Sequence, residues 1–370
     1  MEGIGIALLV CLLLLLVSRR ISMPAIPLYI LSGMILGGSG LGIVENSEVS
    51  GYLVGIGLTF LLFYVGLELK PSQIRKSGKK FLYSGLIDLN INLILGSMAA
   101  YAFGFSPAES LVIGASLYIS SSAIVLASLT ENRKLVFREA ETIIWLMIFE
   151  DIVLAFMILF LSVGDGNLFM PLISLVMLVT VIFVIVYLLR GGISALLEKD
   201  DEIPVFFTFS TVVFTAFFAE YIGVHSSLAV IALGSALSMT NPEVLEANSR
   251  PFKDVFMVLF FVFFGVSVQI SGNMSILLIL AMSVVAMLTK VLTGLLIGRT
   301  VHGSYISGIE IGTSIIPRAE FSIAIAALYG SPVVSGIVAG VVIVTSFAGS
   351  FLARYSVMIK KFVHEKTGLE

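Results

Sequence analysis

The chain has 370 residues, of which 58% are hydrophobic and 12% charged, with a formal net charge of −3 and a mean hydropathy of +1.09. This composition excludes an ordinary soluble globular protein and indicates a polytopic membrane protein. A single cysteine excludes an intrachain disulfide, and three scattered histidines argue against a histidine metal site. No glycine-rich phosphate loop, metal-spaced cluster or basic face is present, so we expect no cofactor, no enzymatic activity and no nucleic-acid partner.

Apolar segments of spanning length predict an all-α membrane protein with about thirteen transmembrane helices. Neither a basic segment nor a small-residue cleavage site accompanies the first apolar run, so we interpret it as a spanning helix. In chain order, the predicted spans are 3–17, 24–38, 51–69, 80–104, 107–128, 139–163, 168–190, 203–222, 226–240, 252–270, 274–300, 305–330 and 332–359.

The basic residues of the connections lie on one side of this predicted topology. Connections after odd-numbered helices and the C-terminal tail hold all of the 21 Lys and Arg residues except Lys290 and Arg318, and connections after even-numbered helices hold none. We expect the protein in the plasma membrane. By the positive-inside rule, its N-terminus lies outside the cell and its C-terminus lies in the cytoplasm. No connection is long enough to form a soluble domain. Whether a cytosolic regulatory domain or subunit outside this chain acts with it is an open alternative.

Two adjacent carboxylates, Glu150 and Asp151, lie in the middle of the predicted span 139–163. A helical rise of about 1.5 Å per residue places Glu150 roughly 18 Å beyond Arg138, near the centre of a ~30 Å hydrocarbon core. Ionisable residues at this depth are costly and mark ion paths, proton relays or paired charges. Successive helical residues point about 100° apart, so one carboxylate can face a cavity while the other contacts a neighbouring helix. The alternative is a pair of protonated carboxyls that serve packing only.

Two cations also lie inside predicted spans. Lys290 is close to mid-depth in 274–300 and is the expected counter-ion for a carboxylate of the sixth helix, with a snorkelling lysine as the alternative. Arg318 and Glu320 are two residues apart, and we expect an ion pair between them or with a neighbour, with direct ion binding as the alternative. Asp88 is a further candidate partner for a neighbouring cation, and its role stays open.

Two predicted helices are interrupted at mid-depth. Three consecutive serines, Ser120 to Ser122, interrupt the span 107–128. Pro317 interrupts 305–330, because proline lacks a backbone donor and clashes with the preceding turn. These helices are seven apart in the chain, so they run in opposite directions. Matching interruptions in opposed helices are typical of an inverted-repeat transporter with its site at the midplane. The alternative is one proline kink and a serine-rich packing face.

Several segments match motifs of one family in that family's order. They are YILSGMILGGSGLGIV (29–44), LLFYVGLELKP (61–71), ASLYISSSAIVLASL (115–129), FEDIV (149–153), PFKDVFMVLFFVFFGVSV (251–268), TKVLTGLLIGR (289–299) and PRAEFS (317–322). On these segments the chain resembles the monovalent cation:proton antiporter-2 family, within the sodium/proton exchanger superfamily, over nearly its whole length.

The resemblance implies a homodimer with two inverted five-helix repeats, helices 2–6 and 9–13, in which the broken helices 5 and 12 cross beside the ion site. Scaffold and dimerisation helices would occupy 1–70 and 203–270. The ion-transport core would occupy 80–163 and 274–360, and a linking helix 168–190.

The resemblance also assigns roles to individual residues. Asp151 matches the aspartate that binds the cation, Na⁺ or K⁺, or the proton, and Glu150 takes the position before it. Lys290 matches the lysine that pairs with that preceding acid. The remaining matches are Ser121 and Ser122 at the crossover and Glu320 on the twelfth helix. Arg318, beside Glu320, we assign to the coupling residues because of the expected ion pair and not from the resemblance.

The expected function is secondary active exchange of a monovalent cation, with Na⁺ favoured, for H⁺ by alternating access, as in pH homeostasis. The alternative within the family is a K⁺/H⁺ antiporter or K⁺ efflux system. Rivals from other classes are a sodium-coupled solute symporter, a cation channel and an intramembrane aspartyl protease. The paired interruptions argue against a channel, and the aspartyl protease motif is absent from the sequence.

Overall fold

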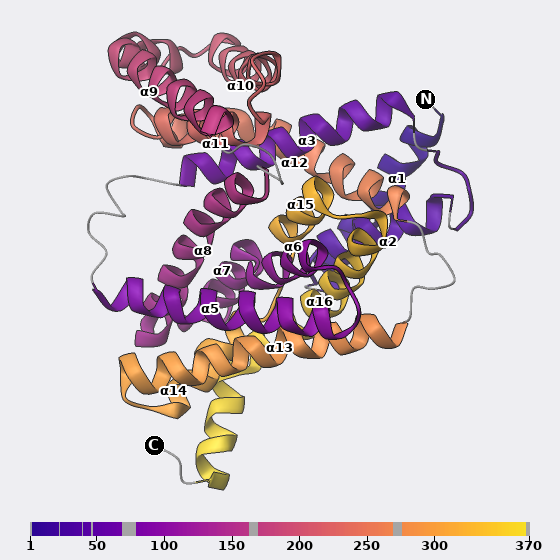
Figure 1. The fold of residues 1–370 in the computed structure, drawn as a ribbon, viewed down its shortest axis with the longest axis vertical. Helices are drawn as coiled ribbons and strands as arrows, with labels where there is room; N and C mark the ends of the chain where they lie inside the picture. Colours follow the sequence, from indigo (N-terminus) through magenta and orange to yellow (C-terminus); the bar gives the residue numbers. More distant parts are fainter. Residues whose placement is uncertain are drawn as a thin grey trace. The chain divides into compact units, whose positions relative to one another are not determined.

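A computed structural model describes residues 2–21, 23–38, 40–45, 47–68, 79–162, 169–268 and 276–367 of the chain (Figure 1). The described residues contain helices and no β-strand, which confirms the predicted all-helical class. Helical residues occupy each of the predicted ranges. The predicted helix ends at 69, 163, 168, 270 and 274, and the basic connection with Lys70, Arg75 and Lys76, lie outside the described residues.

Among the described residues, seven helices are long and apolar enough to cross a membrane, judged by length and composition. Three further apolar helices are shorter, at 10–17 residues. A polytopic membrane protein is therefore the class that the helices support. The number of crossings, the inverted repeats and the orientation of the termini stay predictions.

The helices group into two compact units that we describe separately. The first unit comprises Met1–Asn46, Ser77–Glu150 and Val262–Glu370, and the second comprises Ser47–Lys76 and Asp151–Phe261. The predicted division into core and scaffold stays a prediction.

The second unit is built around α11. It contains α3 (Glu48–Glu68), α9 (Phe169–Leu197), α10 (Ile203–Tyr221) and α11 (Ser226–Leu237). It also contains the larger part of α12 (Pro242–Ser267) and the part of α8 (Arg138–Ser162) that follows Glu150. α11 packs against α3, α9 and α10. Where α3 meets α11, Gly66 and Gly234 let the two backbones touch: a Cβ on Gly66 would lie 2.2 Å from Ile231 O. Membrane helices associate through such close van der Waals packing, because lipid offers no hydrophobic driving force between them.

The first unit holds the two interrupted helices. Its elements are α1 (Glu2–Ile21), α2 (Ile26–Leu36), α5 (Lys79–Ala102), α6 (Pro107–Tyr118), α7 (Ser122–Glu131), η1 (Lys134–Val136), the start of α8, the end of α12, α13 (Ile276–Ile297), η2 (Gly298–His302), α14 (Tyr305–Ser314), α15 (Glu320–Tyr329) and α16 (Pro332–Thr367). α5 packs against α6 and α13, α13 against α14, and α14 against α16 (Figure 1). α5 and α13 therefore pack on α6 and α14, the helices that lead into the two interruptions.

The sequence explains both interruptions. After Tyr118 the backbone turns extended at Ile119, and the Ser121 hydroxyl then caps α7 by accepting from the amide of Ile124. α14 ends at Ser314, just before Pro317, whose ring cannot continue a helix. Each predicted broken helix is therefore two short helices joined by extended chain.

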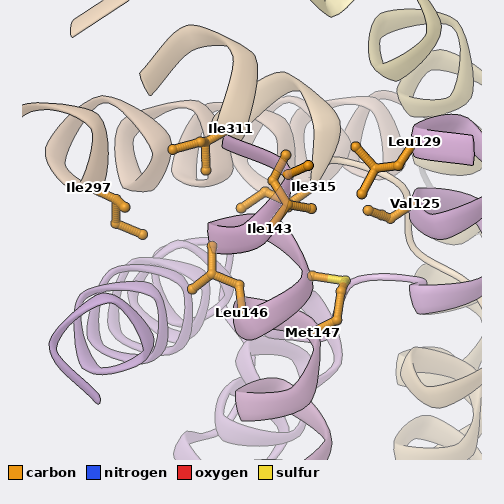
Figure 2. Close-up of a cluster of buried hydrophobic side chains, with 9 residues drawn as sticks. Val125, Leu129, Ile143, Leu146, Met147, Ile297, Ile311 and Ile315 are labelled. Atoms are coloured by element: carbon orange, nitrogen blue, oxygen red, sulfur yellow. The ribbon is translucent and has the colours of Figure 1, made fainter. Parts of the chain in front are cut away.

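An apolar cluster positions the first half of α8. Figure 2 shows its members Val125 and Leu129 of α7, Ile143, Leu146 and Met147 of α8, Ile297 of α13, Ile311 of α14, and Ile315. Ile143, Ile297, Ile311 and Ile315 are each 0% exposed. This packing fixes the helical turn that precedes Glu150.

An ion-pair cluster joins the same half of α8 to two other helices. Lys360 of α16 pairs with Glu139 of α8 and, at 2.8 Å, with Glu310 of α14. Ser307 of α14 also donates to Glu139, at 2.8 Å. The start of α8 is thus tied to the α14–α16 layer by charge as well as by apolar contact.

Candidate functional site

A buried lysine lies between two carboxylates beside the interrupted helices. Lys290 Nζ on α13 lies 2.9 and 3.0 Å from the two carboxylate oxygens of Asp88 on α5, and 2.7 Å from Glu150 Oε1 on α8. All three side chains are at most 1% exposed. The sequence predicts Lys290 as counter-ion to a carboxylate of the sixth helix, and Glu150 is that carboxylate.

Glu150 is also held by the first interruption. Its Oε2 accepts from the backbone amide of Ser120, and Ser120 Oγ lies 3.0 Å from Oε1. The same Oγ lies 2.9 Å from Ile315 O, at the second interruption. A hydroxyl has one proton, so Ser120 can donate to only one of these acceptors at a time. Glu150 therefore connects Lys290 to the backbone of both broken helices.

Asp88 is held by Asn92 of α5 and Lys290 of α13, and its carboxyl also lies beside that of Glu150 on α8. Asn92, one turn along α5, donates its amide to Asp88 Oδ1 at 2.8 Å and to Thr293 Oγ1 of α13 at 3.0 Å. The ring of Tyr118, the last residue of α6, lies 5.2 Å from Lys290 Nζ, within cation–π range. The buried ammonium is therefore surrounded by carboxylate oxygens and an aromatic face, as a charge at membrane depth requires.

The two interruptions bond to each other. The amide of Ser121 donates to Pro317 O at 2.8 Å, and Ser322 Oγ donates to Ile119 O at 3.2 Å. Ser121 Oγ also donates to Glu320 Oε2 at 3.3 Å. Glu320 is the first residue of α15, where a carboxylate faces the positive end of the helix dipole.

Arg318 corrects one expectation. The sequence predicts an ion pair for it, but the guanidinium donates to backbone carbonyls instead: Nε to Leu117 O at 2.8 Å, Nη1 to Ile315 O and Ile316 O, and Nη2 to Ala286 O at 3.3 Å. Its own carbonyl accepts from Ser346 Oγ. The last carbonyls of α6 and those after α14 have no helical partner, and they carry partial negative charge. A fully buried arginine is thus better matched by these helix ends than by one carboxylate.

The other predicted site residues lie as follows. Asp151, the residue after Glu150 in α8, is 5% exposed and belongs to the second compact unit. Ser122 is the first residue of α7 and is half-buried. Within the first unit the structure brings together Glu150, Lys290 and the serine interruption, with Ser121 on Glu320 beside them.

Sequence reasoning left two residues of this arrangement out of the predicted site. Asp88 had only an open role, and the available signal was that an aspartate inside a predicted span needs a buried partner. Ser120 was identified only as part of the interruption, and no sequence pattern shows which of three serines meets Glu150. No group of three or more His, Cys, Asp or Glu side chains in the described ranges could hold a metal ion as a resident cofactor.

Comparisons with known proteins agree with this architecture. Residues 5–357 match the family described as "Sodium/hydrogen exchanger, transmembrane". The K⁺/H⁺ antiporter subunit KhtU of Bacillus subtilis is 31% identical over 345 residues, covering 88% of this chain and 84% of that protein. The Na⁺/H⁺ antiporter of Enterococcus hirae is 29% identical over 343 residues, covering 88% and 89%. The Na⁺/H⁺-K⁺ antiporter GerN of Bacillus cereus is 28% identical over 337 residues, covering 87% and 85%.

A solved structure shares the fold. The sodium proton antiporter MjNhaP1 from Methanocaldococcus jannaschii, at pH 8, superimposes with a TM-score of 0.67 over 99% of this chain and 98% of its own, at 19% identity. The paired interruptions and the family match, which extends from residue 5 to residue 357, lead to one conclusion: the chain belongs to the sodium/hydrogen exchanger family of membrane antiporters.

Proposed function

We propose that this protein exchanges a monovalent cation for protons across the plasma membrane by alternating access. The observation that carries the proposal is the buried Lys290, held by Asp88 and Glu150 beside the helix interruptions, in a chain of the exchanger family. Broken helices and ionisable groups at mid-depth are the usual parts of a transporter site.

Asp151 is the proposed ligand for which the cation and the proton compete. A carboxylate in a partly dehydrated site can hold a proton or a hard cation, whose preferred ligands are oxygens. Competition for one group couples the two fluxes without a second site. Ser121, Ser122 and Glu320 are the proposed polar surroundings of the crossover.

Glu150 and Lys290 are the proposed coupling pair. Cation binding beside Glu150 weakens its salt bridge to Lys290, and proton binding restores it. The core helices of 80–163 and 274–360 then move as a block against the scaffold of a homodimer, with the N-terminus outside. Buried groups coupled in this way titrate as a unit.

Na⁺ is the cation that we favour from the sequence. K⁺ is the second candidate, because the relative at 31% identity is a subunit of a K⁺/H⁺ antiporter. The name of that relative also makes a separate subunit a candidate partner of this chain.

The test is proton exchange in proteoliposomes that contain a pH-sensitive dye, with Na⁺, K⁺ and Li⁺ pulses compared. We expect cation-dependent proton efflux from wild type and its loss in Asp151→Asn. The matched control is Asp254→Asn, which removes an exposed aspartate that pairs with Arg250 and should keep full exchange. Absence of cation-dependent flux in wild type refutes antiport, and full activity of Asp151→Asn refutes the assignment of the site.

A further inference from the structure

The three protons of the Lys290 ammonium have three carboxylate acceptors, and two of them belong to Asp88. The distances to Asp88 Oδ1 and Oδ2 are 2.9 and 3.0 Å, against 2.7 Å to the single Glu150 oxygen. Lysine has three donors. If Glu150 turns away, two of the three charged hydrogen bonds of Lys290 remain.

Asp88 and Lys290 form a fixed pair. Their helices, α5 and α13, pack directly against each other, and both side chains are 0% exposed. Asn92 bonds Asp88 and Thr293 of α13 at once, so it adds a second link between the same two helices. No Asp88 contact in the described part of the chain involves either interruption.

Glu150 differs, because it divides its oxygens between Lys290 and Ser120 in the first interruption. In the described residues the ionisable side chains around Lys290 include Asp88 on α5, Glu150 on α8 and the Tyr118 phenol on α6. Arg318 is a second buried cation nearby: it donates to Ala286 O, one turn before Lys290 on α13, and its charge acts on both carboxylates. Glu150 is the member whose salt bridge to Lys290 cation binding is proposed to weaken, and Asp88 is not.

We propose that Asp88 keeps Lys290 protonated throughout the transport cycle, so that exchange is one cation for one proton and electroneutral. This inference rests on the proposed cation/proton exchange. A buried ammonium that loses its only partner faces a cost of several kcal/mol, and it sheds its proton instead. With Asp88 in place, the Asp88–Lys290 pair stays neutral whether or not Glu150 is engaged. The exchanged proton is then carried by carboxylates, and Lys290 is a positioning residue.

The experiment measures the balance point of exchange in proteoliposomes of the full chain. A cation gradient is imposed, and the opposing pH difference that stops net proton flux is found with membrane potential collapsed by the permeant anion thiocyanate. For one-for-one exchange a tenfold cation gradient balances about one pH unit, and for two protons per cation about half a unit. We expect about one unit for wild type, with flux unchanged by thiocyanate.

Asp88→Asn removes the fixed partner and leaves Glu150 as the only carboxylate on Lys290. We expect its balance point to move toward about half a pH unit, because Lys290 now releases a second proton, and its flux to rise with thiocyanate. The matched control is Asn90→Ala on the same helix, where the exposed side chain bonds only its own helix at Leu86 O. That control should balance like wild type.

Several outcomes overturn the inference. The inference is wrong if the wild type balances near half a pH unit, whatever the variants do. It is also wrong if Asp88→Asn still balances near one pH unit. If Asp88→Asn does not fold, the inference is tested by the balance points of wild type and of Asp88→Glu. Asp88→Glu keeps the negative charge, so it must balance near one pH unit. A wild type with no cation-dependent proton flux refutes the proposed function itself, which is a different result from flux with the wrong balance point.

Discussion

Replacing Arg318 by glutamine tests whether the contact between the broken helices depends on one guanidinium. Arg318 is 0% exposed and donates to the carbonyls of Leu117, Ile315, Ile316 and Ala286. Glutamine keeps a polar end with two donors, but it is shorter and uncharged. The variant therefore leaves Leu117 O and Ile316 O without the donor that Arg318 supplies.

The expected loss follows from the number of carbonyls affected. An unsatisfied buried polar group costs about 1–3 kcal/mol. Ile315 O keeps Ser120 Oγ as a donor and Ala286 O keeps Thr289 Oγ1, so we count two carbonyls at the lower figure and obtain about 2 kcal/mol. For a chain of 370 residues such a loss lowers Tm by about 3 °C. Arg318→Lys keeps the charge but not the planar fork, and it should lie between glutamine and wild type.

The assay is thermal unfolding of detergent-purified protein, followed by size-exclusion chromatography after heating. Arg299→Gln is the control, because Arg299 is exposed and its bond to Gly303 O, at 3.4 Å, is long. A Tm of Arg318→Gln equal to that of Arg299→Gln refutes the argument that helix-end carbonyls depend on Arg318. A normal Tm in Arg318→Lys together with a low one in Arg318→Gln would show that charge matters more than geometry.

Two further predictions concern packing and pH. Gly294→Ala should lower Tm, with a cost of about 1–3 kcal/mol from overpacking, because its Cβ would lie 2.3 Å from Gly312 N. Gly191→Ala has open space and should not lower Tm, and equal Tm values for the two variants would contradict the proposed clash. Lys134, in the connection before α8, has a pKa that burial lowers to about 8 from its ordinary 10.5. Between about pH 8 and pH 10.5, Lys134 is more often protonated in the unfolded chain than in the folded one. The free energy of unfolding therefore increases as pH rises through this range, by up to about 3 kcal/mol. In Lys134→Met the rise should be missing, so the Tm of the variant relative to wild type should fall between about pH 7 and pH 10, and a constant difference would refute the argument.

Much of the fold could be predicted from the sequence because a bilayer imposes strong rules. Apolar length and the alternation of basic connections locate helices without any knowledge of packing. Pro317 identifies one interruption through its chemistry, and the serine run identifies the other through its place in an opposed helix. Helical ranges were therefore predictable to within several residues.

The partners of the site residues were less predictable, because they depend on which helix faces contact each other. Arg318 and Glu320 are close in sequence, and proximity favoured an ion pair. Ala319 between them is not helical (φ −157°, ψ −119°), however, and the guanidinium meets the helix ends. Asp88 lies 202 positions from Lys290, and only the packing of α5 on α13 joins them. Neither helix carries a signal for that contact beyond the charges themselves.

The use of helix-end carbonyls has a consequence for where a cation can bind. In many transporters with discontinuous helices, freed carbonyls coordinate the ion directly. Here the carbonyls of Leu117, Ile315 and Ile316 accept from Arg318, whose charge also repels a cation. A cation at these interruptions therefore needs side-chain carboxylates for its negative ligands. Asp88 and one oxygen of Glu150 already bond Lys290, and Glu320 accepts from Ser121. Asp151, the next carboxylate of α8, is the side chain that we propose as the ligand of the exchanged cation.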